Sequence, residues 1–337
     1  MSKIKFAVIG LGHIGKRHAQ MIKNNEWAEL VAGIDCNATL KADIESTFGC
    51  PFFNSAEEFF ASGIKADVIN VCTPNGLHAQ HAILALENAC HVVVEKPMGL
   101  TKADCEKVIY KSLQAHKHVF CVMQNRYSPP SAWLKQVLTE GRLGKIYMAQ
   151  INCYWNRDER YYKKGGWKGT LDLDGGPLFT QFSHFLDIMY WLLGDIKNIT
   201  ARFENFNHAY TPFEDSGAVN FDFYDGGLGV FNYSTSNWDK NLESSLTIIG
   251  EKGSIKVGGQ YMDKVEFCHV KDYEMPELPP SNPPNDYGAY KGSAANHHYV
   301  IENVIDTLQG KSTATTNALE GLKVVEIIER IYALKAK

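Results

Sequence analysis

The sequence predicts an α/β protein: an N-terminal doubly wound parallel sheet, then a C-terminal α+β domain built on a large, mostly antiparallel, open-faced sheet. Short apolar runs alternate with amphipathic segments through the first 124 residues, which is typical of strands and crossover helices. A glycine-rich turn, Gly10–Gly15, directly follows the first apolar run. After residue 125, hairpin signals replace the alternation. We therefore expect two domains, 1–124 and 125–337, with the last helix free to pack back on the first.

The composition excludes several classes of partner. Hydrophobic residues make up 45% of the chain, charged residues 21%, and the formal net charge is −4. No block of Lys and Arg is present, so neither nucleic acid nor a membrane is an expected partner. The eight cysteines show no Cys-x-x-Cys pair and no zinc-type spacing, so we expect buried thiols and no metal site. The N-terminus enters an apolar strand without a signal-peptide pattern, and we expect a cytoplasmic protein.

The elements of the first domain follow from its apolar periodicity. Continuous apolar runs predict parallel strands over Ile4–Ile9, Glu29–Asp35, Val68–Cys72, His91–Val94 and His118–Met123. Amphipathic segments predict helices over Gly15–Lys23, Ser55–Ala61, His78–Asn88 and Thr101–Ala115. Ser55 with Glu58 forms a capping-box pattern, and Thr101 is a suitable N-cap. Right-handed crossovers bring the carboxyl ends of these strands to one edge of the sheet.

The second domain is predicted as a sheet with a few helices. Apolar alternation and turn signals predict strands over Ile146–Trp155, Ile199–Phe206, Ala218–Tyr224, Leu228–Ser234, Ser244–Ile249, Ser254–Val257 and Val265–His269. Helices are expected over Ser131–Thr139, Pro177–Leu193, His297–Leu308 and Ala318–Ala333. The proline-rich segment 276–284 is expected to be an irregular loop. We expect helix Pro177–Leu193 to cover one sheet face and a second subunit to cover the other, in a homodimer or homotetramer.

The glycine-rich turn carries the pattern of a dinucleotide site. In Gly10-Leu-Gly12-His-Ile-Gly15, the first glycine permits a tight turn, the second lets the backbone approach a pyrophosphate, and the third lets helix and strand pack closely. The helix that follows supplies backbone amides and a dipole for the phosphates. We assign all three glycines, with His13 and Ile14, to cofactor binding.

The end of the second strand indicates which dinucleotide is bound. Asp35 lies twenty residues after Gly15, where a carboxylate accepts both ribose hydroxyls and repels a 2′-phosphate. No Arg follows it to receive such a phosphate, so NAD is favoured over NADP. Thr73-Pro74-Asn75 lies on the same edge and leads to His78. We assign these four residues to the cofactor, although His78 is equally well explained as part of a solvated first helical turn.

Glu95-Lys96-Pro97 follows the fourth predicted strand. Ligands of a doubly wound sheet sit outside the carboxyl ends of its strands, so Lys96 is aimed at cofactor and substrate, and we interpret it as catalytic. A lysine before a proline at a strand end is usually a surface residue; the glycine turn reverses that expectation. In the second domain, Thr180, Gln181, His184 and Asp187 recur at helical spacing and predict one polar helix face. A satisfied structural histidine is the alternative for His184.

An irregular segment adds aromatic and cationic residues, among them Arg157, Trp167 and Lys168. Aromatic rings beside arginine suit a substrate with a sugar face and a negative group; subunit contact is an equally good explanation. His297, at the start of a late helix, is ambiguous in the same way.

The chain resembles the Gfo/Idh/MocA oxidoreductases over nearly its whole length. The residues that carry the resemblance are the glycine turn, Asp35, Thr73-Pro-Asn, Glu95-Lys-Pro, Asp174-Gly-Gly, His184 and Asp187. Trp167-Lys-Gly-Thr and Asn296-His-His are most similar to the sugar-nucleotide branch, which includes UDP-N-acetylglucosamine and UDP-N-acetylglucosaminuronate 3-dehydrogenases.

The resemblance implies reversible hydride transfer between a sugar ring carbon and nicotinamide, with C3 of a UDP-N-acetylhexosamine or its uronate as the expected position. Lys96 would help to remove the hydroxyl proton, with His184 as its partner or as the general base itself. We assign Glu95, Lys96, Gln124 and Trp167 to the cofactor as well. The expected substrate contacts are Lys96, Arg126, Arg157, Lys168, Thr180, Gln181, His184 and His297. 2-Oxoglutarate is a candidate oxidant for the bound NADH.

One departure from the family pattern matters. Thr180 and Phe182 stand where the family often has Asp or Asn and Gly, and Thr180 cannot carry charge. This weakens a proton relay of the inositol-dehydrogenase type and a free polyol substrate. A dehydrogenase of free aldoses or inositols remains the alternative, and a non-catalytic sensor of NAD or sugar is a lesser one.

Overall fold

The computed structural model describes residues 2–288 and 290–335. The chain forms two compact units, one of residues 1–123 with 297–325, the other of residues 124–296 with 326–337. The units are therefore discontinuous in sequence, and their division falls inside helix α10 (Ala318–Tyr332). The predicted division after residue 124 stays a prediction.

The first unit contains a six-stranded parallel sheet of order β3-β2-β1-β4-β5-β6. Its strands are β1 (Ile4–Ile9), β2 (Ala28–Ile34), β3 (Phe52–Phe53), β4 (Val68–Val71), β5 (His91–Val94) and β6 (Val119–Cys121). The five predicted strands are confirmed, and the short edge strand β3 was missed. The order reverses between β1 and β4, which is where a doubly wound sheet binds its ligand.

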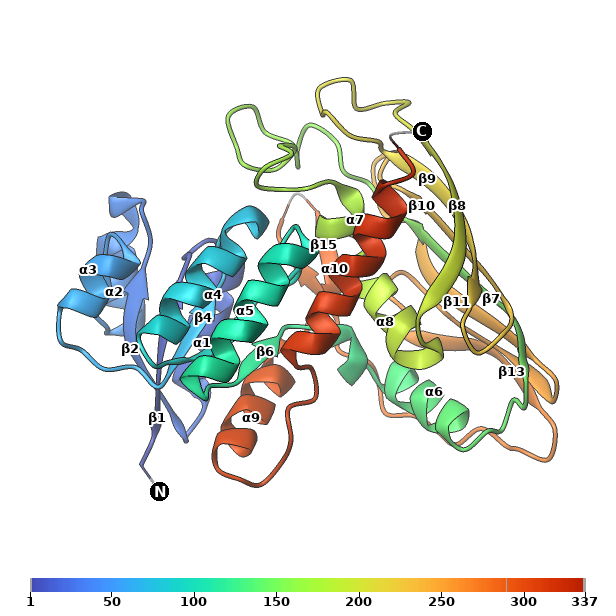
Figure 1. Cartoon of the computed structure of the whole chain (residues 1–337), viewed down its shortest axis with the longest axis horizontal. Helices are drawn as coiled ribbons and strands as arrows, with labels where there is room; N and C mark the ends of the chain where they lie inside the picture. The colour runs from blue at the N-terminus through green and yellow to red at the C-terminus, as the bar shows by residue number, and fades with distance from the viewer. Residues whose placement is uncertain (1, 289, 336–337) are drawn as a thin grey trace. The chain divides into compact units, whose positions relative to one another are not determined.

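Helices flank this sheet, and Figure 1 shows α4 and α5 side by side. The helices are α1 (His13–Asn24), α2 (Lys41–Phe48), α3 (Ala56–Ala61), α4 (His78–Glu87), α5 (Lys102–Ala115) and α9 (His297–Leu308). Short 3₁₀ turns η1 (Ala38–Leu40) and η2 (Asn75–Leu77) precede α2 and α4. Sequence reasoning missed α2, because only Ile44 and Phe48 of this helix are buried and so its apolar stripe is short.

Two predicted helix caps are present. The Thr101 hydroxyl accepts a hydrogen bond from the backbone amide of Asp104, and the Ser55 hydroxyl accepts one from the amide of Glu58. The Glu58 carboxylate reaches back to the amide of Asn54, one residue before the position that a standard capping box uses.

The second unit contains a seven-stranded sheet of order β13-β12-β11-β7-β10-β9-β8, in which only the β7–β10 pair is parallel. Its strands are β7 (Ile146–Tyr154), β8 (Ile196–Glu204), β9 (Ser216–Phe223), β10 (Leu228–Ser234), β11 (Glu243–Gly250), β12 (Gly253–Gly258) and β13 (Lys264–Val270). The prediction of a mostly antiparallel sheet is confirmed. Figure 1 shows α6 (Pro129–Thr139) beside α8 (Ser183–Leu193) against this sheet.

The prediction of one helix over Pro177–Leu193 is wrong. The segment forms α7 (Pro177–Thr180) and α8, separated at residues 181–182. The amide of Phe182 bonds the Pro177 carbonyl, five residues back, and the amide of Phe185 bonds the Phe182 carbonyl, three residues back. This interruption packs the Phe182 ring against Trp155, Phe231 and Tyr233 of the sheet side. Thr180 and Gln181 therefore do not share a continuous helix face with His184.

The proline-rich segment is irregular up to a two-stranded hairpin, β14 (Pro284–Asp286) with β15 (Lys291–Ala294), which was not predicted. The 3₁₀ turn η3 (Gln124–Tyr127) opens the second unit. In the part of the chain that the structure describes, no helix has the length and apolar character needed to cross a bilayer.

Candidate active site

The glycine turn has the geometry that a pyrophosphate requires. Gly10 adopts φ +87°, and a Cβ there would lie 2.7 Å from the Cys72 backbone. A Cβ on Gly15 would lie 1.8 Å from the Gly10 carbonyl oxygen, so only glycine lets α1 pack this closely. A Cβ on Gly12 would meet nothing within 4 Å. Gly12 is the N-cap of α1 and provides no side-chain cap, so the first-turn amides stay open to phosphate oxygens.

Asp35 anchors this turn. Its Oδ2 accepts a 2.6 Å hydrogen bond from the Leu11 amide, and its Oδ1 accepts one of 2.8 Å from Asn37. A carboxylate oxygen accepts more than one hydrogen bond, so both oxygens keep capacity for ribose hydroxyls. His13, next to this turn, is exposed, and Ile14 is half-buried.

The turns after β4 and β5 are tied together by His78, which is buried in the first turn of α4. Its Nδ1 lies 2.6 Å from the Pro97 carbonyl oxygen, and its Nε2 lies 2.7 Å from that of Thr73. A neutral imidazole carries one N–H, so it donates to one of these carbonyls at a time. Burial lowers the pKa of His78. Pro74 precedes η2, and Asn75 opens it as a buried residue.

Glu95 and Lys96 directly follow β5 and differ in their exposure. Glu95 is buried, whereas the Lys96 side chain is half-buried. Burial opposes ionisation of Glu95, but the hydrogen bond with His18, with the charges around it, outweighs this cost and lowers its pKa to about 2. His297, the first residue of α9, places its Nε2 3.7 Å from Glu95 Oε1, and burial lowers its pKa to about 3.

In the second unit, His184 lies in the first turn of α8 and is buried. Its Nε2 is 3.4 Å from the side-chain nitrogen of Gln124, which donates a 2.9 Å hydrogen bond to the Ser293 hydroxyl. Gln181 and Ser183 are also buried, and their side-chain polar atoms have no hydrogen-bond partner among the residues that the structure describes.

Thr180 is engaged by a buried carboxylate. Its hydroxyl donates to Asp174, whose other oxygen accepts a 2.8 Å hydrogen bond from the Gly169 amide. Burial raises the pKa of Asp174. This contact ties the Trp167-Lys-Gly-Thr segment to α7; Trp167 and Lys168 themselves are half-buried.

Arg126 forms a buried bidentate ion pair with Asp187. Its Nε donates to Oδ2 at 2.9 Å and its Nη2 donates to Oδ1 at 2.6 Å. The fork-like geometry of guanidinium and carboxylate makes such pairs strong and directional. The pair joins η3 to α8, the two elements that carry Gln124 and His184.

Arg157 is a buried cation held by rings and carbonyls. Its guanidinium lies 4.7 Å from the Trp155 ring centroid and 5.1 Å from those of Tyr161 and Tyr290. It donates to the backbone oxygens of Asn156 and Lys291. Burial lowers its pKa.

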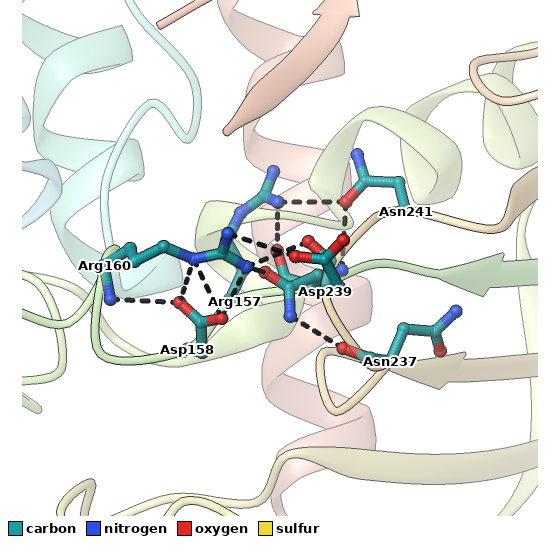
Figure 2. A network of polar contacts seen from close by, with 7 residues as sticks. Arg157, Asp158, Arg160, Asn237, Asp239 and Asn241 are labelled. Carbon is teal, nitrogen blue, oxygen red and sulfur yellow. Dashed lines mark hydrogen bonds and ion pairs between the residues drawn. The ribbon is translucent and has the colours of Figure 1, made fainter. Parts of the chain in front are cut away.

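Figure 2 shows the network around this arginine: Arg157 also donates to Asn241, and Arg160 bonds Asp158 and Asp239. Lys168 belongs to the same aromatic cluster. Its Nζ lies 3.9 Å from the Tyr161 ring centroid and donates to the Tyr290 hydroxyl at 2.7 Å.

Sequence reasoning missed His18, Asn70 and Ser293, and it named Asp174 only as part of a family motif. A histidine one turn after the glycine motif was the available signal for His18, whereas Asn70 and Ser293 give no local signal because their partners are distant in the chain. Among the described residues, no group of three or more His, Cys, Asp or Glu side chains could hold a metal ion.

The open glycine turn, the uncapped start of α1 and Asp35 at the end of β2 fit a dinucleotide with a free ribose diol. A parallel doubly wound sheet with this turn is typical of NAD-dependent oxidoreductases.

Comparison with known proteins places the chain within this class. Residues 4–122 match the oxidoreductase family with an NAD-binding Rossmann fold, and residues 132–256 match the GFO/IDH/MocA C-terminal domain. The chain belongs to the Gfo/Idh/MocA oxidoreductase family, and it is an NAD-dependent sugar dehydrogenase acting on a CH–OH group.

Three proteins illustrate what the chain is similar to. The WlbA dehydrogenases from Chromobacterium violaceum and Bordetella pertussis, each solved with NADH and UDP-GlcNAcA, are 30% identical with TM-scores of 0.89; they match 100% of this chain and 94% and 96% of their own. D-glucoside 3-dehydrogenase of Escherichia coli is 26% identical, covering 98% of this chain and 95% of its own length.

Proposed function

We propose that the protein oxidises the C3 hydroxyl of a UDP-N-acetylhexosamine or its uronate, with NAD as the hydride acceptor. The observation that carries this proposal is the similarity, over nearly the whole of both chains, to two structures that hold NADH with UDP-GlcNAcA. The more distant relatives act on varied substrates. The specific proposal for this protein is therefore that its sugar substrate is linked to a nucleotide.

Lys96 is the residue proposed to accept the hydroxyl proton. Bound NAD would supply the hydride acceptor: as the ring C–H bond breaks and the carbon becomes a ketone, the hydride would pass to the nicotinamide. The hydroxyl proton goes to the neutral amine of Lys96 or to His184, the second candidate base. The half-buried position of Lys96 at the end of β5 and the position of His184 in the first turn of α8 support these roles.

Unit two offers polar groups suited to a sugar. Gln181, Ser183 and Asn125 are buried, and their side chains have unmet hydrogen-bonding capacity within the described part of the chain. An unmet buried polar group costs about 1–3 kcal/mol, so ligand hydroxyls or an N-acetyl group at these positions would relieve the cost. Arg157 and Lys168, set among aromatic rings, are the proposed contacts for the charged part of the substrate.

The remaining assignments are part of the same proposal. The cofactor contacts are proposed as assigned from the sequence, and so are Arg126, Thr180 and His297 as substrate contacts. Reoxidation of NADH by 2-oxoglutarate and assembly as a homodimer or homotetramer also stay predictions.

NADH absorbance with purified protein, NAD and a panel of UDP-sugars, their uronates and free sugars tests the proposal, with and without 2-oxoglutarate. We expect turnover with a UDP-N-acetylhexosamine or its uronate. Turnover with free glucosides alone would move the protein to the aldose group. Cofactor binding without hydride transfer to any sugar would favour a sensor.

A further inference from the structure

One buried carboxylate joins the helix of the glycine turn to the strand end that bears Lys96. Glu95 Oε1 lies 3.0 Å from His18 Nε2 on α1, and Glu95 Oε2 accepts a 3.2 Å hydrogen bond from the backbone amide of Lys96. His18 and Glu95 are 1% and 6% exposed, so water competes little for either contact. The Lys96 backbone is therefore held by a side chain that is itself held from α1.

A third residue sets the proton position on His18. The side-chain nitrogen of Asn70, on β4, lies 2.8 Å from His18 Nδ1. With this amide nitrogen as the donor, Nδ1 is the acceptor, and Nε2 carries a proton that faces Glu95. Asn70 is fully buried. The three side chains form one hydrogen-bonded row, with His18 between the Asn70 amide and the Glu95 carboxylate.

We propose that Glu95, His18 and Asn70 are positioning residues for Lys96, which hold its backbone and keep one negative charge on the adjacent residue. This inference rests on the proposed role of Lys96 as proton acceptor. None of the three touches the substrate in the proposed reaction; they act through Lys96.

The negative charge of Glu95 affects the proton affinity of Lys96 in one direction. The titratable and charged groups that face Glu95 come from several elements: His18, Cys72, His78, Lys96 and His297, with Arg17 facing His297. Burial keeps His297 neutral, and the hydrogen bond with His18 is the largest of the interactions that keep Glu95 ionised. The attraction between Glu95 and Lys96 is reciprocal, so ionised Glu95 raises the proton affinity of the Lys96 amine, which makes the neutral amine a stronger proton acceptor.

Competitive acetylation of Lys96 by acetic anhydride as a function of pH, followed by mass spectrometry, tests this without any sugar. In Glu95→Gln we expect the titration midpoint of Lys96 to fall by about one pH unit, because the neighbouring anion is lost. Glu87→Gln is the matched control. Glu87 is the last residue of α4 and pairs with Lys111, so the titration midpoint of Lys96 should not move in this variant. An unchanged midpoint in Glu95→Gln would overturn the proposal.

Variants at His18 test the positioning role by kinetics. His18→Leu removes the donor to Glu95, and we expect kcat to fall by roughly ten- to a hundred-fold through misplacement of Lys96, with little change in the KM for NAD. His18→Gln keeps an amide donor and should recover most of kcat. Equal losses in both variants with the Lys96 midpoint at its wild-type value would show a purely structural role and overturn the proposal.

The two measurements separate this inference from the proposed function. If no sugar is oxidised, the proposed function fails, whereas the acetylation profile of Glu95→Gln still decides whether Glu95 controls Lys96. If His18→Leu does not fold, the same profile carries the test.

Discussion

Lys96 is half-buried and directly follows the carboxyl end of the parallel strand β5. For Lys96→Met, which keeps the aliphatic stem and removes the amine, we expect kcat for sugar oxidation to fall by about 10²–10⁴-fold, the range for a lost general base. The affinity for NADH, followed by fluorescence titration, should fall far less than kcat, because Lys96 is one of many proposed cofactor contacts. Lys111→Met, a surface lysine paired with Glu87, is the control. Wild-type turnover in Lys96→Met would remove Lys96 from the chemistry.

Two glycines of the same turn provide a matched pair. In Gly15→Ala the new Cβ would lie 1.8 Å from the Gly10 carbonyl, and we expect the free energy of unfolding to fall by about 1–3 kcal/mol, as for an overpacked site. In Gly12→Ala the Cβ meets no protein atom within 4 Å, so stability should hold while NADH affinity falls roughly ten-fold, which corresponds to about 1.4 kcal/mol.

Thermal unfolding and NADH titration of both glycine variants check this contrast. If Gly12→Ala bound NADH as tightly as the wild type, the pyrophosphate would not approach this backbone position. If Gly15→Ala were as stable as the wild type, the close contact between α1 and β1 would be less tight than the structure indicates.

The contact between η3 and α8 depends on the Arg126–Asp187 pair, in which both side chains are 1% exposed. Arg126→Met leaves a buried carboxylate without its partner, and we expect a loss of about 3–5 kcal/mol in the free energy of unfolding. The double variant Arg126→Met/Asp187→Leu should recover most of it, because no unpaired charge remains. Urea denaturation measures both.

Kinetics of the same variants separate two roles for Arg126. If it also binds substrate, the stable double variant will show a raised KM for the sugar. If it serves only to hold η3 against α8, the KM will stay near the wild-type value.

The break between α7 and α8 shows how an element can escape local analysis. The segment 177–193 is apolar and has helical spacing throughout, so a single helix is the local expectation. The helix is interrupted because Phe182 packs against Phe231 and Tyr233 of the sheet in the second unit. A continuous helix would instead keep its regular backbone hydrogen bonds at this position. The strands, by contrast, were predictable because alternation and hairpin turns are local signals.

The whole protein is expected to lose stability in mild acid. The folded-state pKa of His297 is about 3, below its ordinary value of 6.5, so the unfolded chain takes up this proton first as pH falls below 6.5. The pKa of Glu95 is about 2 rather than 4.5, so the stability that it contributes is present above 4.5 and is lost as pH falls towards 2. His297 therefore makes stability rise with pH between about 3 and 6.5, and Glu95 makes it rise between about 2 and 4.5.

Thermal unfolding between pH 4.5 and 7 measures this slope. His297→Gln removes the buried imidazole and should flatten the dependence between pH 6.5 and 4.5. His116→Asn, at an exposed left-handed position after α5, is the control and should keep the wild-type slope. An identical slope in His297→Gln would mean that His297 does not take part in acid unfolding.

Local signals in the sequence were sufficient to predict the doubly wound sheet, the glycine turn and the strand-end positions of Asp35 and Lys96. Each of these features depends on residues within one turn or one strand. The partners of the polar groups required the tertiary structure. Glu95 meets His18 across 77 residues, Gln124 meets Ser293 across 169, and Arg126 meets Asp187 across 61. Such pairs form because a buried polar group must find a hydrogen bond wherever packing places one, and packing is a property of the folded chain.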